Sequence, residues 1–379
     1  MTDTAVELID DLSAIDPADW NALAADHPFV THAFLDALHA TGCAVRRTGW
    51  QPTYLVLRRG GRLLGAMPLY VKAHSRGEYV FDHAWAEAFE RHGLDYYPKL
   101  LCAVPFTPVG GPRLLAASHE DRVLLARAAI EVARQAEVSS LHVLFPRDED
   151  LLALREAGYM MREGVQFHWR NEGYASFDAF LGAMNHDKRK KIRQDRKKVQ
   201  QAGIRFRHLR GQAITPDDLA FFYRCYASTY AHHWSSPYLN PAFFEALHAA
   251  MPEAMLLVLA EREGEPVASA LNIAAGDTLY GRYWGCVDFV SGLHFETCYL
   301  QAIEYCIANG YACFEGGAQG VHKMSRGLLP TPTWSAHWVA DQRFAAAIAD
   351  FLKRETRGMN QYLDELESHT PFKAPAERD

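Results

Sequence analysis

The chain has 379 residues, too many for one typical domain of roughly 100–200 residues and suited to two. Hydrophobic residues make up 49% and charged residues 22%, so a large core can form and disorder as the main state is excluded. With 39 Lys and Arg against 46 Asp and Glu, the net charge is −7, which excludes a protein that is basic overall and binds nucleic acid in that way.

The 7 cysteines lie far apart and form no CxxC pair, a pattern typical of reduced thiols in a cytosolic protein. The N-terminal stretch MTDTAVELIDDLSAI is acidic and lacks the apolar core of a signal peptide. No apolar run reaches the ~18–20 residues of a membrane helix. We therefore expect a cytoplasmic protein without a membrane span. Since no His or Cys cluster has ligand spacing, we expect no metal site.

Strands and helices are expected to alternate in the first half of the chain. Thr31 can cap a helix to about residue 40, and a glycine turn at 60–61 predicts a hairpin of strands 54–57 and 63–71. The following elements are predicted as a third strand at 78–81, a helix at 118–136, a strand at 141–145, a short helix ending at 157 and a strand at 165–170.

The pattern restarts at Ser176, which begins a capped helix, and Asn185 begins a second helix that Gly203 ends. Thr215 and Pro216 predict a further helix to about residue 232. The remaining expected elements are strands at 204–209, 256–260, 267–274, 278–284, 312–315 and 334–339, and helices at 295–309 and 343–366. A loop rich in glycine and polar residues occupies 316–330.

Two segments about 200 residues apart, 54–85 and 256–284, follow the same order. Each has a strand, a charged glycine turn, a strand with small residues, an acidic turn and an aromatic strand that ends in Trp. Hairpins are common, but three strands in a shared order favour a tandem repeat.

This unit, followed by a helix, resembles the core of the GNAT acyltransferases. The run 186–203, HDKRKKIRQDRKKVQQAG, is similar to the K-x-R-x-x-I-R-x-A…G helix of the Fem-type peptidoglycan aminoacyltransferases. Phe314-Glu-Gly-Gly followed by His322-Lys-Met-Ser-Arg-Gly resembles their F-D-x-G-G…F-K-x-x-F-G ending. The resemblance implies an α/β fold with mixed sheets, made of two GNAT-like lobes at 1–170 and 171–379. It also implies a FemAB-like protein of the peptidoglycan biosynthesis or recognition type.

The chain departs from these patterns at three places. The GNAT pyrophosphate loop, R/Q-x-x-G-x-G/A, would fall at 285–296, where the spacing is missing. Glu315 and His322 stand where the Fem ending has Asp and Phe. The resemblance implies an N-acyltransferase that moves an acyl group from an acyl-CoA-type thioester to a small-molecule or peptide amine. Two alternatives stay open, a Fem-like transferase that uses aminoacyl-tRNA and a non-catalytic recognition module. In the enzyme cases CoA or tRNA is a co-substrate, and we expect neither a tightly bound cofactor nor DNA.

Positive charge is concentrated in the run 186–198, which has a local charge of +6 in a background of −13. On a helix Arg189, Arg193 and Lys197 share a face. One interpretation is a contact with phosphate or RNA, because several cations together neutralise a polyanion. The other, weighed about equally, is a solvated helix that balances an acidic protein.

Substrate binding is expected at the aromatic strand 278–284, through Arg282 and Tyr283. In a GNAT fold this strand splays from its neighbour, and its backbone amides hold the acyl carbonyl. Gly281 and Gly285 would let a ligand approach the backbone closely. The alternative is that these aromatic residues belong to the core.

Acyl transfer to an amine needs a base for the ammonium proton and an acid for the leaving group. His294 titrates near neutrality, whereas Glu296 near a helix start would need burial to raise its pKa. Either residue could instead cap the helix or lie on the surface.

The polar loop 315–327 is the richest candidate site, because loops at strand ends commonly carry ligands. The resemblance places Lys323 in an acceptor pocket, where Lys323 and Arg326 would stabilise a phosphate or an oxyanion. Glu315 and His322 are alternative bases, and Gln319 is a candidate for substrate binding. The alternative is an ordinary mobile loop.

Overall fold

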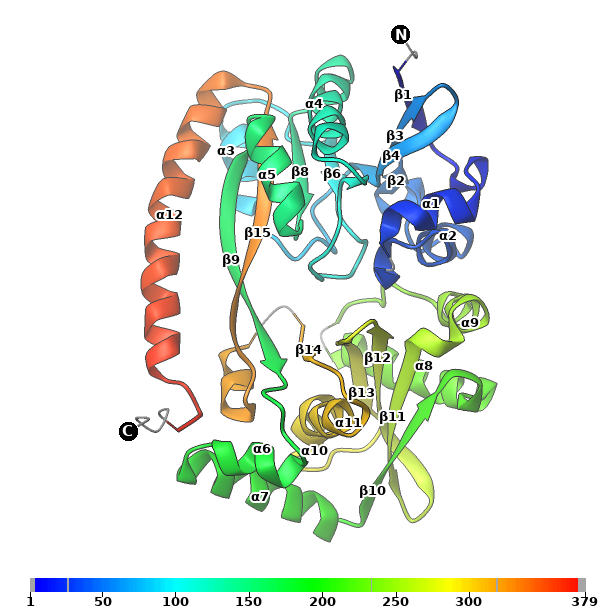
Figure 1. Cartoon of the computed structure of the whole chain (residues 1–379), viewed down its shortest axis with the longest axis vertical. Coiled ribbons are helices and arrows are strands. Elements are labelled where there is room, and N and C mark those ends of the chain that lie inside the picture. Colours follow the sequence, from blue (N-terminus) through cyan, green and yellow to red (C-terminus); the bar gives the residue numbers. More distant parts are fainter. Residues whose placement is uncertain (1–3, 26, 233, 318–319, 374–379) are drawn as a thin grey trace. The chain divides into compact units, whose positions relative to one another are not determined.

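The computed structural model describes residues 4–25, 27–232, 234–317 and 320–373 (Figure 1). The chain forms two compact units. Unit 1 comprises Met1–Gly164 and Pro332–Gln361, and unit 2 comprises Val165–Thr331 and Tyr362–Asp379. The chain therefore returns to unit 1 after it has built most of unit 2, and residues 332–361 lie outside the range expected for the N-terminal lobe.

Unit 1 contains a small sheet in the order β1-β3-β4-β7, with all neighbours antiparallel. Its other strands follow the order β15-β8-β6-β5-β2, in which β6 and β8 are parallel. The strands are β1 (Thr4–Ile9), β2 (Trp50–Pro52), β3 (Tyr54–Arg59), β4 (Arg62–Met67), β5 (Leu69–Lys72), β6 (Lys99–Cys102), β7 (Leu115–Ala116), β8 (Ser140–Leu144) and β15 (Leu329–Val339). The helices are α1 (Pro17–Ala24), α2 (His32–Ala40), α3 (His83–Arg91), α4 (His119–Gln135), α5 (Asp148–Glu156) and the larger part of α12 (Gln342–Ser368).

Unit 2 has the strand order β10-β11-β12-β13-β14-β9 (Figure 1). The neighbours are antiparallel except β13 and β14, which are parallel. The strands are β9 (Met160–Arg170), β10 (Ile204–Arg210), β11 (Met255–Arg262), β12 (Glu265–Ala275), β13 (Thr278–Cys286) and β14 (Cys313–Glu315). The helices are α6 (Phe177–Ala183), α7 (His186–Gln201), α8 (Pro216–His232), α9 (Pro241–Ala250), α10 (Leu293–Phe295), a π-helical turn (Glu296–Leu300), α11 (Gln301–Asn309) and a 3-10 helix (Val321–Arg326).

The predicted helix starts are confirmed by their caps. Thr31, Ser118, Ser176 and Asn185 each accept a hydrogen bond from a backbone N–H in the first turn of the helix that follows. Each side chain satisfies a donor that the helix itself leaves unpaired. Local chemistry alone fixes these four boundaries.

The predicted strand at 78–81 is wrong, because no strand forms there. Tyr79 has a φ of 65°, which lies outside the extended region. The side chain of Glu78 turns inward and lies 2.7 Å from the buried ammonium of Lys99. The first segment of the expected repeat keeps the hairpin of β3 and β4 but lacks the aromatic strand, since its Trp85 lies in α3.

The hairpin expected at 54–71 is interrupted at Pro68, which separates β4 from β5. Strand β4 pairs with β3, whereas β5 pairs with β2 and β6. Proline lacks the N–H that a continuous ladder requires, so the chain changes sheets at this point.

Helices pack on both faces of β13. A Cβ at Gly285 would point into the α8 backbone, and the ring of Trp284 contacts His294 in α10. Successive residues of a strand point to opposite faces, so α8 and α10 cover opposite sides of this strand. The aromatic part of β13 is thereby held between two helical layers, next to the end of β14.

Candidate functional site

A cavity opens in unit 2 where the pairing of β13 with β14 stops. The two strands pair only from Thr278 to Tyr280, although β13 continues to Cys286. The cavity beyond that point has a volume of about 120 Å³, and we call it the splay cavity. Its lining includes Asn272, Arg282, Tyr283, Trp284, His294, Cys298, Tyr299 and Phe314. The expected opening between these strands is therefore present.

A β-bulge places Arg282 at this cavity. In the pairing of β12 with β13, Leu271 faces Tyr283 and Asn272 faces Gly281, so Arg282 is the extra residue. Regular strands send successive side chains to opposite faces, whereas a bulge re-aims one of them. Arg282 and Tyr283 consequently line the same cavity, as expected for two substrate-binding residues.

Lys323 is buried next to β13, with only 3% of its surface exposed. Its Nζ donates a hydrogen bond to the carbonyl oxygen of Gly317 at 2.8 Å. A Cβ added to Gly317 would lie 3.8 Å from this Nζ and 3.9 Å from the carbonyl oxygen of Gly281. Burial, with the charge of Arg282 adding to it, lowers the pKa of Lys323 to about 8. Lys323 is thus a cation that loses its proton close to physiological pH.

His294 joins the cavity from α10. Its ring centroid lies 4.9 Å from that of Trp284 and 5.6 Å from that of Tyr299. Burial, together with the charges of His322 and Lys323, lowers the pKa of His294 to about 4. The imidazole is therefore neutral at pH 7, in contrast to the expected titration near neutrality.

His322 and Arg326 lie beside this cavity rather than in its lining. His322 is exposed, and its ring centroid lies 5.5 Å from that of Phe295. The guanidinium of Arg326 lies 3.8 Å above the same ring and 3.9 Å from a carboxylate oxygen of Asp195. Desolvation lowers the pKa of both side chains. His322 is therefore neutral at pH 7, whereas the guanidinium of Arg326 extends the positive charge outward from Lys323.

Two further predicted residues are Glu315, at the end of β14, and Gln319. Glu315 is the last residue of that strand and pairs in register with Tyr280 and His168. Burial, followed by the charge of Glu315, raises the pKa of Tyr280. Gln319 lies outside the described residues.

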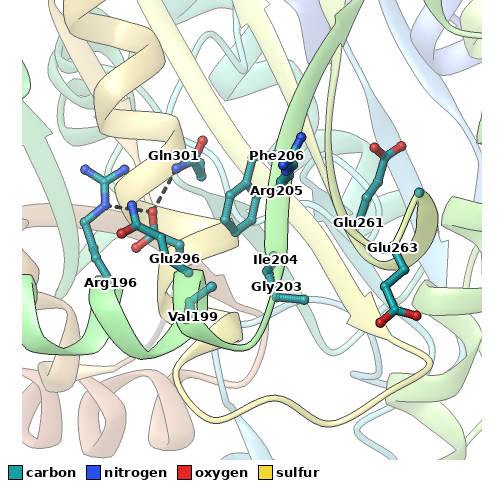
Figure 2. Close-up of a pocket in the computed structure, with 12 residues that line it drawn as sticks. Arg196, Val199, Gly203, Ile204, Arg205, Phe206, Glu261, Glu263, Glu296 and Gln301 are labelled. Carbon is teal, nitrogen blue, oxygen red and sulfur yellow. Dashed lines mark hydrogen bonds and ion pairs between the residues drawn. The ribbon is translucent and has the colours of Figure 1, made fainter.

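The structure separates Glu296 from the splay cavity. Glu296 is buried on the π-helical turn, where the Nε of Arg196 lies 3.0 Å from its Oε1 and Gln301 donates a hydrogen bond of 2.8 Å. It lines a different cavity of about 820 Å³ (Figure 2). Burial raises the pKa of Glu296, and the charge of Arg196 opposes this shift. Glu296 is therefore buried, as a raised pKa requires, but it lies at a cavity other than the splay cavity.

The basic run forms α7, and Arg189, Arg193 and Lys197 share a face as predicted. They line a shallow cavity of about 350 Å³ together with Lys190. Ile192 and Val199 face the core. Of these cations Arg193 has an ion pair, with a distance of 3.4 Å to exposed Asp178. The face therefore presents a dense positive charge to solvent.

Gly281 and Gly285 both pack closely against neighbouring elements, and Gly281 also lines the splay cavity. A Cβ at Gly285 would lie 1.7 Å from the carbonyl oxygen of Cys225 in α8. A Cβ at Gly281 would lie 2.9 Å from the ring of Phe314. The α8 hydroxyls of Ser228 and Thr229 also donate to the β13 carbonyls of Cys286 and Trp284, at 3.0 and 2.9 Å.

Asn272 and Cys298 line the splay cavity but were not predicted. Asn272 is 1% exposed, and its Nδ2 has no hydrogen-bond partner among the described residues. The sequence does hold a signal for Asn272, because it is an amide within a strand, 267–274, whose other residues are small or apolar. Cys298 carried no such signal, because only the π-helical turn directs it to this cavity.

A family profile described as peptidoglycan biosynthesis/recognition, FemAB-like, matches residues 11–374. The chain belongs to the FemAB-like family. Its fold is similar to that of FemX, at 13% identity and a TM-score of 0.56, over 90% of this chain and 100% of that one. It is also similar to L-PGS from Bacillus licheniformis, at 10% identity and a TM-score of 0.53, over 90% and 96%. No curated protein matches the chain.

These similarities confirm the predicted fold class, a FemAB-like α/β fold with mixed sheets. Within the described ranges, no helix is both long and apolar enough to cross a membrane. Among the same residues, no group of His, Cys, Asp and Glu side chains is arranged to hold a metal ion. All seven cysteines are free thiols.

Proposed function

We propose that this FemAB-like protein is an N-acyltransferase, with its reaction centre at the splay cavity of unit 2. The observation that carries the proposal is the buried Lys323, held beside β13 next to Arg282. Arg282 lines this small cavity, and the buried ammonium of Lys323 lies beside it. Two cations so placed suit a reaction in which negative charge develops on a carbonyl oxygen. Family membership supports an acceptor of the peptidoglycan type.

In this reaction the amine nitrogen bonds to the acyl carbonyl carbon, and the carbonyl oxygen becomes an oxyanion. Lys323 and Arg282 stabilise that charge. The intermediate collapses as the bond to the leaving oxygen or sulfur breaks, and the leaving atom takes a proton. With a pKa of about 8, the ammonium of Lys323 is a suitable donor of this proton at neutral pH. The attacking nitrogen carries one extra proton in the intermediate and passes it to the now neutral Lys323 as the amide forms, which restores the ammonium.

The positive surroundings also prepare the nucleophile. Burial and the charge of Arg282 lower the pKa of Lys323. A substrate ammonium that enters the cavity meets the same two conditions, so the pKa of the substrate amine also falls. Its proton is then released to solvent. His294, whose pKa is about 4, is too weak a base to keep that proton, and it orients the neutral amine by accepting a hydrogen bond.

We further propose aminoacyl-tRNA as the acyl donor. The segment 287–292, between β13 and α10, lies where a GNAT protein binds pyrophosphate. It contains no Lys or Arg, and its Asp288 is paired with Arg262. The exposed cations of unit 2 are instead concentrated on α7, a surface that suits a polyanion better than one pyrophosphate. An acyl-CoA thioester is the alternative donor.

The deciding experiment incubates the purified protein with radiolabelled aminoacyl-tRNA or acyl-CoA and a peptidoglycan-precursor peptide that carries a free amine. We expect transfer of label from aminoacyl-tRNA, and loss of that transfer in Lys323→Met. Transfer from acyl-CoA alone would overturn the donor assignment. Full activity of Lys323→Met would overturn the site. Binding of the peptide without turnover from either donor would favour a recognition module.

A further inference from the structure

The 820 Å³ cavity in unit 2 is separate from the proposed reaction centre. It lies between the second half of α7, the start of β10, the turn from β11 to β12 and the π-helical turn (Figure 2). His294, Arg282 and Lys323 are not among its lining residues in the described part of the chain. We call it the Glu296 cavity.

The carboxyl group of Glu296 is only partly satisfied. Its Oε1 receives Arg196 and Gln301, at 3.0 and 2.8 Å. Its Oε2 is buried and has no hydrogen-bond partner among the described residues. A buried carboxylate oxygen without a donor costs free energy, and the cost is larger for a charged group than for a neutral one. A ligand that brings an N–H donor to Oε2 would remove this cost.

An apolar wall adjoins this acceptor. Val199 and Ile204 are buried, and Phe206 is half-buried with its ring between Glu296 and the strand edge (Figure 2). An aromatic face attracts a cation as well as an apolar body. The cavity therefore combines a buried hydrogen-bond acceptor, Glu296, with an apolar wall against which a hydrocarbon group can pack.

Arg196, the cation paired with Glu296, also has a second acidic partner. Arg196 contacts Glu304, at 2.5 Å, in addition to Glu296. Its charge is shared between two carboxylates, and Glu296 Oε2 keeps no hydrogen-bond donor among the described residues. Bonds from a charged donor to a carboxylate are stronger than those from a neutral one.

We propose that the Glu296 cavity binds a primary organic ammonium with an apolar body, whose N–H groups bond to Glu296 Oε2 and whose body packs on Phe206. This site is additional to the acyl-transfer centre and does not depend on the proposed function.

The test is isothermal titration of the full-length protein with phenethylammonium. Its isosteres 2-phenylethanol and 3-phenylpropionate replace the ammonium with a neutral and an anionic group. We expect phenethylammonium to bind at least about tenfold more tightly than either, and Glu296→Gln to weaken its binding by about tenfold or more. Glu245→Gln is the matched control, since it removes an exposed carboxylate on α9 outside this cavity, and should leave the affinity unchanged.

A second variant keeps the proposal testable if Glu296→Gln fails to fold. Phe206→Leu retains the buried charge pair and removes the aromatic wall, so phenethylammonium should bind several-fold more weakly and n-butylammonium almost unchanged. Equal binding of the alcohol or the carboxylate would overturn the proposal. So would unchanged affinity in a folded Glu296→Gln, or in Phe206→Leu.

Discussion

The ammonium of Lys323 donates a 2.8 Å hydrogen bond to the carbonyl oxygen of Gly317. This bond ties the 3-10 helix Val321–Arg326 to the segment that leaves β14, and it fixes the charge beside β13. A flexible lysine is thereby pre-organised, which reduces the reorganisation needed when charge develops nearby.

Replacing Lys323 with Met should reduce kcat/KM for acyl transfer by at least about 100-fold, since a single preorganised donor is worth about that much. Steady-state kinetics with a saturating donor measure the effect, and thermal melting checks the fold. Lys353→Met, on the exposed surface of α12, is the control and should retain full activity. A loss of less than about threefold would remove Lys323 from the reaction.

The pH dependence follows from the pKa of about 8 for Lys323. The side chain is protonated below that pH and neutral above it, so kcat should fall as pH rises through about 8. Lys323→Arg keeps a charge at higher pH and should move the fall upward. A profile identical in wild type and Lys323→Arg would contradict the assignment.

The same group links stability to pH. Its folded-state pKa lies below the ordinary lysine pKa of 10.5, so the unfolded chain binds more protons between about pH 8 and 10.5. The free energy of unfolding of wild type, relative to Lys323→Met, should therefore rise across this window and stay flat below it. Urea unfolding at pH 7, 8, 9 and 10 provides the measurement, and a relative decrease with pH would show the opposite shift.

Gly285→Ala should destabilise the protein by about 3 kcal/mol, because its Cβ would collide with backbone rather than with a movable side chain. Gly182→Ala is the control, since no atom lies within 4 Å of the added methyl. Chemical denaturation of both variants gives the difference. Equal stabilities would mean that α8 moves freely away from β13.

Reversing the charge of Arg189, Arg193 and Lys197 to Glu should weaken tRNA binding and flatten its dependence on salt, because fewer counterions are released. Filter binding at several salt concentrations measures both quantities. An equal charge change elsewhere, with Arg127, Arg134 and Lys353 replaced by Glu, should have a much smaller effect. If the two triple variants bind alike, only net charge matters and α7 is not the docking face.

Lys99→Met should destabilise unit 1 by about 3–5 kcal/mol, because the change leaves buried Glu78 and Asp82 without their shared cation. Calorimetric or urea unfolding measures the loss, and the exposed Lys353→Met serves as control. A variant as stable as wild type would mean that Lys72, 3.8 Å from Glu78, is a sufficient partner.

Local signals predicted the elements whose boundaries depend on near neighbours. Asn185 caps α7 through a residue three positions away, and the sequence identified that helix. Helix α9 is absent from the predicted elements, although Asn240-Pro241 at its start is a helix-start signal of the same kind as Thr215-Pro216. Short β1 was also missed, because its pairing partner β3 lies about fifty residues away.

The errors depend on contacts between distant residues. Residues 78–81 contain aromatic and β-branched side chains, yet Lys99 draws Glu78 inward and prevents a strand. Glu296 was grouped with His294 because the two are close in sequence, whereas the helical turn points them to different cavities. The position of Arg282 depends on a bulge that only the register of β12 reveals.

The return of the chain to unit 1 determines which fragments of this protein should fold. Strand β15 pairs with β8 from Ser335 to Val339, so a fragment that ends at Arg170 exposes the edge of β8 and should aggregate. A fragment of unit 2 likewise needs the C-terminal segment, where Phe372 packs against Phe180. Each half becomes an independent folding unit only when its two separate stretches are joined by a new linker.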